Sequence, residues 1–126
     1  MNVVDSSGWL EFFADGPNAD FFAQPIQDAK NLIVPTLSMF EVFKRVAEQR
    51  GEHDALQAVA VMQQGTVVEL TLALALDSAR TSLGRRLPMA DSVMLATAEA
   101  FGAVFWTQDA DFSDVEGVKY IVTKRP

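Results

Sequence analysis

The chain has 126 residues, of which 49% are hydrophobic and 21% are charged, a composition typical of one globular domain rather than of a disordered chain. It contains no cysteine, which excludes disulfide bonds, a thiolate nucleophile and a zinc–sulfur cluster. Its formal net charge of −7 disfavours binding to polyanions in general, so a nucleic-acid function must explain where the acidic residues lie.

The first third of the chain predicts a strand, two helices and a second strand. Val3 and Val4 are β-branched and are followed by an acidic residue, as expected at the end of a short buried strand. Trp9, Phe12 and Phe13 are spaced i, i+3 and i+4, which predicts a helix with an apolar stripe. The expected elements here are a strand over 2–4, helices over 6–14 and 19–28, and a strand over 32–35.

The remainder of the chain continues this alternation of strands and helices. Thr36 or Ser38 would cap the next helix, and Pro88 and Gly102 would mark the beginning and the end of the last one. The expected helices cover residues 36–50, 53–64, 71–86 and 88–101, and the expected strands cover 65–70, 103–107 and 118–122. Alternating strands and helices predict a parallel α/β sheet, and the unbroken apolar strands predict helices on both of its faces.

The sequence has neither a signal-peptide pattern nor an apolar stretch of membrane-spanning length. The N-terminus lacks a basic segment followed by an apolar one. The longest apolar run, residues 72–76, is far short of the ~20 residues that a membrane span needs. We therefore expect a cytoplasmic protein with no membrane segment, folded as a single domain over residues 1–126.

Four acidic residues lie at matching places relative to the predicted strands: Asp5, Glu41, Asp91 and Asp109. Asp5 directly follows the first strand, and Asp109 lies two residues beyond the end of the strand over 103–107. Glu41 and Asp91 lie in the first turns of two predicted helices. Because ligands of parallel α/β sheets gather at the carboxyl ends of the strands, the four acids could converge on one edge of the sheet.

Each acid alone also has a simpler structural interpretation. Asp5 could cap the helix that follows it, Asp91 could interact with the positive end of its helix dipole, and Asp109 could stabilise a turn. Glu41 could form an ion pair with Arg45 on a solvated helix face. These interpretations stay open at the level of the sequence.

Asp91 is harder to explain in this way, because its helical neighbours Met94, Leu95 and Ala98 form an apolar face. A lone carboxylate on such a face is costly unless a cation or hydrogen-bond donors compensate it. Two like charges ~4 Å apart repel by ~4 kcal/mol at an effective dielectric constant of ~20. Four converging carboxylates therefore favour a hard divalent cation with oxygen ligands, Mg²⁺ or Mn²⁺.

Four segments of the chain resemble, in order, the characteristic blocks of VapC-type PIN domains, the ribonuclease toxins of VapBC toxin–antitoxin pairs. The segments are VVDSSGWL (3–10), VPTLSMFEVFK (34–44), LPMADSVMLATA (87–98) and TQDADF (107–112). The resemblance implies a three-layer sandwich in which a central parallel sheet is flanked by helices. It also implies an endoribonuclease that uses Mg²⁺ or Mn²⁺ to hydrolyse RNA, leaving 5′-phosphate and 3′-hydroxyl ends.

The resemblance further implies which residues and partners are involved. The metal-binding and catalytic residues would be Asp5, Glu41, Asp91 and Asp109. Asp5 and Asp91 would bind the metal directly, Glu41 would bind it or orient a water, and Asp109 would complete the site. The expected partners are a cognate VapB-type antitoxin, the RNA substrate and a second copy of the chain in a homodimer.

Several further residues are weaker candidates. Asp111 is an alternative to Asp109, although an exposed turn explains it equally, and Thr107 could support the site by hydrogen bonding or be only a strand residue. His53 is the only histidine and lies far from the four segments in sequence, so no side chain is an obvious general base. Proton transfer would then fall to a water activated by the metal.

Substrate contacts are predicted only from proximity in sequence. Lys44, Arg85 and Arg86 lie near acidic segments and could contact RNA phosphates, although an ion pair for Lys44 and a helix end for the arginines explain them too. Aromatic residues near the N-terminus are expected mostly in the core, with some of them open to an antitoxin helix. They are Trp9, Phe12, Phe13, Phe21 and Phe22.

Residues near the first predicted strand disfavour two other classes of protein. A haloacid-dehalogenase-like phosphatase would need a second acid two residues after Asp5, where the sequence has Ser7. A response-regulator receiver would need an adjacent acidic pair near the first strand, and none is present. A Mg²⁺-dependent phosphoryl-transfer protein on a similar sheet, and a PIN scaffold that binds an antitoxin or RNA without cleaving it, remain as alternatives.

Overall fold

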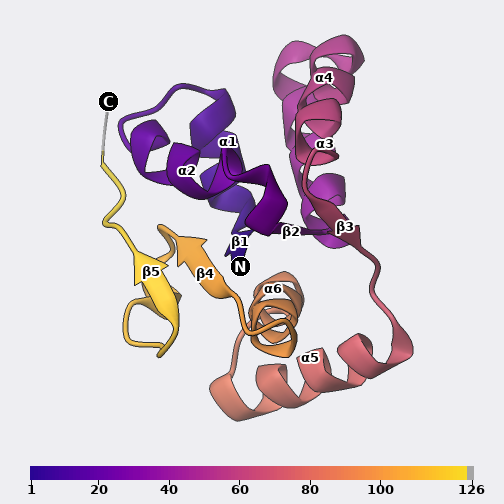
Figure 1. The fold of residues 1–126 in the computed structure, drawn as a ribbon, viewed down its shortest axis with the longest axis vertical. Helices are drawn as coiled ribbons and strands as arrows, with labels where there is room; N and C mark the ends of the chain where they lie inside the picture. The colour runs from indigo at the N-terminus through magenta and orange to yellow at the C-terminus, as the bar shows by residue number, and fades with distance from the viewer. Residues whose placement is uncertain (125–126) are drawn as a thin grey trace.

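Five strands form one parallel sheet with helices on both faces (Figure 1) in the computed structural model, which describes residues 1–124. The strands are β1 (Asn2–Val4), β2 (Leu32–Pro35), β3 (Thr66–Val68), β4 (Val104–Thr107) and β5 (Val118–Tyr120). Their order across the sheet is β3-β2-β1-β4-β5, and each neighbouring pair is parallel. The predicted α/β architecture is confirmed. Residues 125 and 126 of the predicted domain lie outside the described residues.

Six helices connect the strands at the places that the sequence predicts. They are α1 (Ser6–Phe13), α2 (Ala19–Ile26), α3 (Thr36–Arg50), α4 (Glu52–Met62), α5 (Leu72–Arg85) and α6 (Met89–Ala100). Two short 3-10 turns cover Ala29–Asn31 and Ala110–Phe112. Among residues 1–124, no helix combines the length and the apolar character that crossing a membrane requires.

Alternate residues of each strand face opposite layers of helices, which gives the molecule two apolar cores. On one face Val4, Val34 and Trp106 pack with residues of the first four helices. On the other face Val3 and Phe105 pack with residues of α6. Figure 1 shows α1 to α4 on one side of the sheet and α6 on the other, with α5 outside α6. The observed arrangement is the predicted three-layer sandwich.

The predicted core position of the aromatic residues is confirmed. Trp9 and Phe22 are fully buried, and Phe12, Phe13 and Phe21 pack against the same cluster. The rings of Trp9 and Phe13 are stacked, with centroids 5.8 Å apart. These residues therefore hold α1 and α2 on the sheet, and with them the start of α1, which follows Asp5 directly.

The predicted cap of α3 is wrong. Pro35 occupies the N-cap position, and no side chain accepts a hydrogen bond there. Ser38 is instead fully buried, and its Oγ donates to Sδ of Met94 on α6 at 2.9 Å. Tertiary packing between α3 and α6 therefore uses the hydroxyl that the sequence pattern assigns to the helix end.

Gly8 is required where α1 lies close to α2 and β1. A Cβ atom on Gly8 would lie 2.5 Å from the Phe22 ring and 2.9 Å from Cγ1 of Val4.

We expect Gly8→Ala to lower the free energy of unfolding by about 1–3 kcal/mol, because both neighbours belong to the packed core. The control is Gly84→Ala in α5, where a Cβ would meet nothing within 4 Å. The control should be neutral or stabilising by up to about 1 kcal/mol. Urea unfolding measures both, and equal stability of Gly8→Ala and the unmodified chain would contradict this reading.

Candidate metal centre

The fold brings the four predicted acids to one cavity at the carboxyl edge of the sheet. The cavity has a volume of about 490 Å³, and its lining includes Asp5, Glu41, Asp91 and Asp109. Asp5 follows β1 and Asp109 follows β4, which are neighbours in the sheet. Glu41 comes from the second turn of α3 and Asp91 from the first turn of α6. Segments far apart in the sequence thus place four carboxyl groups around the same space.

Asp5 is held in the floor of this cavity by hydroxyl groups. It is 5% exposed, and its Oδ2 accepts hydrogen bonds from Oγ1 of Thr107 at 2.8 Å and from Oγ of Ser7 at 3.2 Å. Asp5 occupies the N-cap position of α1, as the capping interpretation expects, but its side chain makes no capping hydrogen bond there. The first of these contacts is the hydrogen bond that the sequence leaves open for Thr107. Thr107 Oγ1 also accepts from the backbone N–H of Asp109 at 2.9 Å.

Burial makes the charged form of Asp5 unfavourable. Desolvation raises the pKa of Asp5 above its ordinary value of 3.8, and the charge of Asp109 adds to the shift. The hydrogen bonds from Thr107 and Ser7 act in the opposite direction, because they stabilise the carboxylate. The pKa remains raised, so these donors do not fully compensate the buried charge.

The charged form of Asp91 is unfavourable as well. The pKa of Asp91 is raised from 3.8 to about 6, and desolvation is the largest cause. The charges of the neighbouring acids contribute the remainder, in the order Asp5, Asp109, Glu41 and Asp111. A carboxylate stabilised mainly by a helix dipole would have a lowered pKa instead. The surroundings of Asp91 are therefore those of an acid crowded by other acids.

Glu41 is fixed by a contact that the sequence pattern does not reveal. Its Oε1 accepts a hydrogen bond from Oγ of Ser6 at 2.6 Å. The alternative ion pair with Arg45 is not formed: within residues 1–124 the ion pairs are Arg80–Asp77 and Arg85–Glu99. Ser6 and Ser7 thus orient one acid each, and their position directly after Asp5 is the only signal in the sequence.

Asp109 and Asp111 both lie close to Asp91. One carboxylate oxygen from each of the three residues lies within 4.8 Å of the other two. Asp109 also accepts a hydrogen bond from the backbone N–H of Asp111 at 2.9 Å, so the predicted turn role of Asp109 is real and coexists with its place in the cavity. The alternative between Asp109 and Asp111 is not an exclusive one, because both carboxyl groups reach the same group of oxygens.

The donor set fits a hard divalent cation. The acids that meet here all offer carboxylate oxygens, and oxygen is the ligand that Mg²⁺ and Mn²⁺ prefer. The carboxylate oxygens of Asp91, Asp109 and Asp111 lie within 4.8 Å of one another, which is close to twice a metal–oxygen bond of about 2.1 Å. No lysine or arginine among the described residues forms an ion pair with these acids. Lys44 and Arg45 line the same cavity but do not pair with the acids, so the mutual repulsion of the acids is not relieved by a direct ion pair.

The predicted substrate-binding residues separate into two groups. Lys44 lines the acidic cavity, together with Arg45, for which the sequence pattern leaves open an ion pair with Glu41. Arg85 and Arg86 are not among the lining residues: Arg85 lies 4.0 Å from Glu99, and Arg86 ends α5 with a φ of 57°. Proximity in sequence to Asp91 is misleading here because the turn between α5 and α6 leads away from the cavity.

Comparison with known proteins places this geometry in context. A family model described as the PIN domain matches residues 3–118. No curated protein matches the chain. The comparison therefore rests on the family model and on solved structures.

Several solved toxin–antitoxin structures have a similar fold. A toxin–antitoxin complex from Klebsiella pneumoniae is 17% identical, covers 94% of this chain and 96% of that one, and has a TM-score of 0.78. VapC20 from Mycobacterium tuberculosis, described as a sarcin–ricin loop cleaving toxin, is 16% identical over 92% and 95% of the two chains, with a TM-score of 0.76. DNA-bound VapBC from Salmonella typhimurium is 12% identical over 97% of both, with a TM-score of 0.72. At these identities the likeness establishes the fold.

The crowding of Asp91 predicts how stability depends on pH when divalent cations are removed by EDTA. The pKa of Asp91 is about 6 when folded, against an ordinary value of 3.8, so the unfolded chain loses this proton first as the pH rises. The charged carboxylate therefore costs stability progressively between about pH 4 and pH 6, and by a constant amount above that window. The free energy of unfolding of Asp91→Asn should exceed that of the unmodified chain by an amount that grows across this window and then levels off.

Urea unfolding of both proteins at pH 4, 5, 6 and 7 measures this difference. Asp20→Asn is the control for the same chemical change, because Asp20 is exposed on α2 and lies outside the acidic cavity. An Asp91→Asn difference that does not grow between pH 4 and pH 6 would contradict the raised pKa of Asp91.

Proposed function

We propose, given that this chain belongs to the PIN domain family, that it is a Mg²⁺- or Mn²⁺-dependent endoribonuclease and the toxin of a type II toxin–antitoxin pair. The main support is the convergence of Asp5, Glu41, Asp91 and Asp109 on one cavity, where no described lysine or arginine forms an ion pair with them. The similar VapC20 structure is that of a toxin that cleaves the sarcin–ricin loop, which supports RNA as the class of substrate.

Each acid has a distinct role in this proposal. Asp5 and Asp91, the two with raised pKa values, bind the metal directly. Asp109 completes the site with Asp111 beside it, and Glu41 either binds the metal or orients the attacking water. When bound, the metal lowers the pKa of that water and offsets charge on the phosphate.

The hydroxyl groups around the acids are positioning residues. Thr107 and Ser7 fix one oxygen of Asp5, which leaves its other oxygen, Oδ1, for the metal. Ser6 similarly holds Oε1 of Glu41 and leaves Oε2 for the metal or the water. Lys44, on the wall of the cavity, binds a phosphate of the RNA. The reaction is an in-line hydrolysis that leaves 5′-phosphate and 3′-hydroxyl ends.

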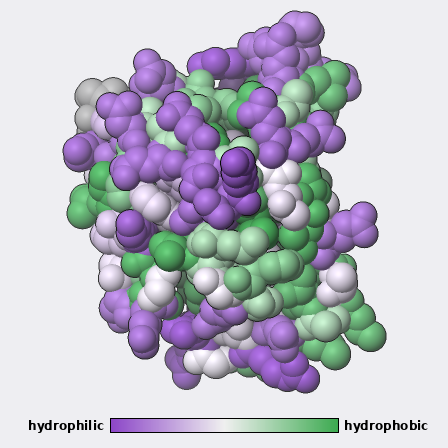
Figure 2. Space-filling model, in the orientation of Figure 1, coloured by the Kyte–Doolittle hydropathy of each residue, from purple (hydrophilic) through white to green (hydrophobic). Residues whose placement is uncertain are grey.

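An apolar groove between α3 and α4 supports the antitoxin partner. The groove has a volume of about 810 Å³, and its lining includes Met39, Phe40, Phe43, Leu56 and Val59. Phe40 is 62% exposed and also lines the acidic cavity, so an apolar segment in the groove would lie beside the acids. Figure 2 shows hydrophobic residues in green along the side of the molecule where α3, β3 and the start of α5 lie. The homodimer remains a prediction from the family resemblance.

Cleavage of RNA by the purified protein tests the proposed function. We expect wild-type protein with Mn²⁺ to cut a mixture of transfer, ribosomal and messenger RNA, and EDTA to stop the reaction. Mutation of a residue that only supports a metal ligand typically lowers metal affinity or activity about 10- to 100-fold. Because Asp91 is proposed as a direct ligand, Asp91→Asn should lower the cleavage rate about 100-fold or more.

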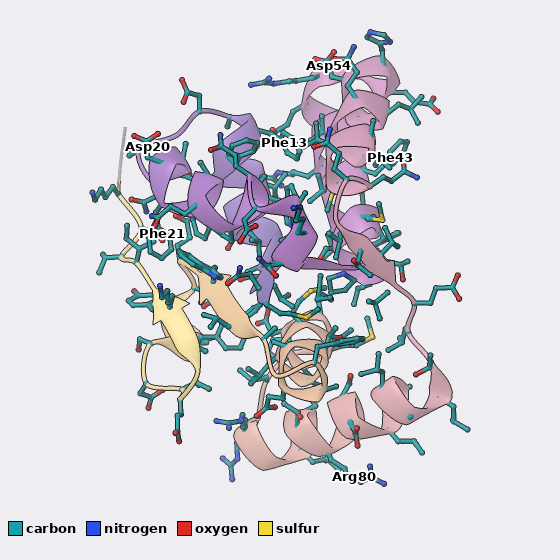
Figure 3. The ribbon with its side chains drawn as sticks, in the orientation of Figure 1. Phe13, Asp20, Phe21, Phe43, Asp54 and Arg80 are labelled. Atoms are coloured by element: carbon teal, nitrogen blue, oxygen red, sulfur yellow. The ribbon has the colours of Figure 1, made fainter. Side chains whose placement is uncertain are left out.

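The matched control is Asp20→Asn, which makes the same chemical change at the exposed position labelled in Figure 3. The control should cleave as the wild type does. Undiminished cleavage by Asp91→Asn would refute the assignment of the site, and wild-type protein that cuts no RNA would favour the non-catalytic scaffold.

A further inference from the structure

A second cavity adjoins the acidic one. It has a volume of about 330 Å³, lies between α1 and α3, and shares Ser7, Leu10 and Arg45 with the acidic cavity. We call it the flanking pocket; its other lining residues include Phe13, Gln49, Arg50 and Gln108. A chain molecule that places one phosphate among the acids can therefore continue directly into this pocket.

Unpaired cations line this path in an otherwise acidic protein. Arg45 lies where the two cavities meet, and Arg50 lies in the flanking pocket. Neither guanidinium forms an ion pair within the described part of the chain. The acid in the flanking pocket, Glu11, already accepts a hydrogen bond from the backbone N–H of Asn18 at 2.7 Å. The guanidinium groups are thus available for a ligand, and their planar donors match phosphate oxygens.

Gln108 joins the flanking pocket to the acidic centre and is held in one orientation. Nδ2 of Asn18 donates to Oε1 of Gln108 at 3.0 Å and also to the carbonyl of Val122 at 3.0 Å. Asn18 is itself 2% exposed, so it is a rigid anchor. Because Oε1 is taken, the Nε2 amino group of Gln108 keeps its two donors for a ligand in the pocket. The neighbouring residue in sequence is Asp109 of the acidic cavity.

The apolar part of the flanking pocket suits a flat ring. Phe13 and Leu10 line it, and the Phe13 ring is only half-buried, backed by the stacked ring of Trp9. Single-stranded RNA is recognised when unstacked bases lie against aromatic rings or guanidinium planes and their edges meet hydrogen-bond donors. The pocket combines these three kinds of contact with a phosphate-binding group at its entrance.

We propose that the flanking pocket binds the nucleotide next to the scissile phosphodiester of a single-stranded RNA. Arg45 binds the phosphate of that nucleotide, Phe13 contacts the base, and Gln108 donates a hydrogen bond to the base edge. Arg50 binds the next phosphate along the strand. The inference rests on the proposed ribonuclease function and adds the residues that select its substrate. Unpaired arginines beside a metal centre favour a polyanion over a peptide as the occupant.

Binding measurements separate this proposal from the question of catalysis. The probe is a fluorescein-labelled single-stranded RNA of 12 nucleotides and random sequence, and the background is Asp91→Asn, so that the RNA stays intact. We expect Arg45→Gln and Arg50→Gln each to weaken binding about tenfold, the loss of one charge-assisted contact. The slope of log Kd against log salt concentration should fall by about 0.7 for each lost phosphate contact.

Arg80→Gln is the matched control for the two arginines. Arg80 lies on α5 at the opposite side of the molecule from Phe13 (Figure 3), and it is paired with Asp77 on the surface. This control should bind RNA within twofold of the parent. Unchanged affinity and salt dependence in both Arg45→Gln and Arg50→Gln would overturn the proposal and leave the pocket to a protein partner.

Gln108→Ala tests the contact to the base. The Kd is measured for labelled oligo-U, oligo-A and oligo-C of 12 nucleotides. The ratio of the largest to the smallest of these three Kd values should be at least threefold smaller in Gln108→Ala than in the parent. The rise in melting temperature caused by Mn²⁺, measured with Asp91 intact, should be retained, which shows that Asp109 is undisturbed. An unchanged pattern of base preference would remove Gln108 from the proposal. Arginine-dependent RNA binding by a protein that cleaves nothing would refute the proposed function and leave the pocket standing.

Discussion

Carboxyl groups from four segments of the chain are crowded together at the carboxyl edge of the sheet, where they repel one another. Asp5 is almost completely buried, and the pKa values of Asp5 and Asp91 are both raised by desolvation and by neighbouring acids. Hydrogen bonds from Thr107 and Ser7 offset only part of the cost of burying and crowding these carboxylates. The fold therefore maintains an arrangement that costs stability, and this is typical of a site kept for binding a cation.

The parallel sheet makes the arrangement possible. β1 lies at the centre of the sheet, with β2 and β4 as its neighbours, so everything that follows these three strands leaves from the same edge. The apolar cores on both faces hold α1, α3 and α6 against the strands and thus fix the depth at which their acids lie. Ser6, Ser7 and Thr107 then set the orientation of individual carboxyl oxygens. Packing of the helices on the sheet therefore determines where the acids lie, and hydrogen bonds from hydroxyl groups determine how their carboxyl groups are oriented.

The sequence predicts those features that depend on strand order and hydrophobic periodicity. The parallel sheet and the helices on both faces follow from the alternation of apolar strands with helices. Asp5, Glu41 and Asp109 reach one edge because they come after the ends of strands, whereas Asp91 follows α5 and reaches that edge because α6 packs on the sheet. The hydrogen bond from Thr107 to Asp5 is also anticipated, because a polar residue at the end of β4 lies beside the end of β1.

Other features depend on side-chain geometry that a single sequence does not contain. Arg45 is four residues after Glu41, which predicts an ion pair, yet Ser6 occupies that carboxylate and Arg45 turns to the junction of two cavities. Arg86 is close to Asp91 in sequence, but the end of α5 carries it away from the cavity. Ser38 resembles a helix cap and is instead buried against Met94. In each case a contact with a distant segment decides the outcome.

Anomalous diffraction from crystals grown with Mn²⁺ tests most directly whether the clustered acids share an ion. We expect an anomalous peak inside the acidic cavity, at a coordination distance of about 2 Å from carboxylate oxygens of Asp5 and Asp91. Density for Mn²⁺ only at other surfaces, with the Asp5 and Asp91 carboxyl groups touching no ion, would contradict it.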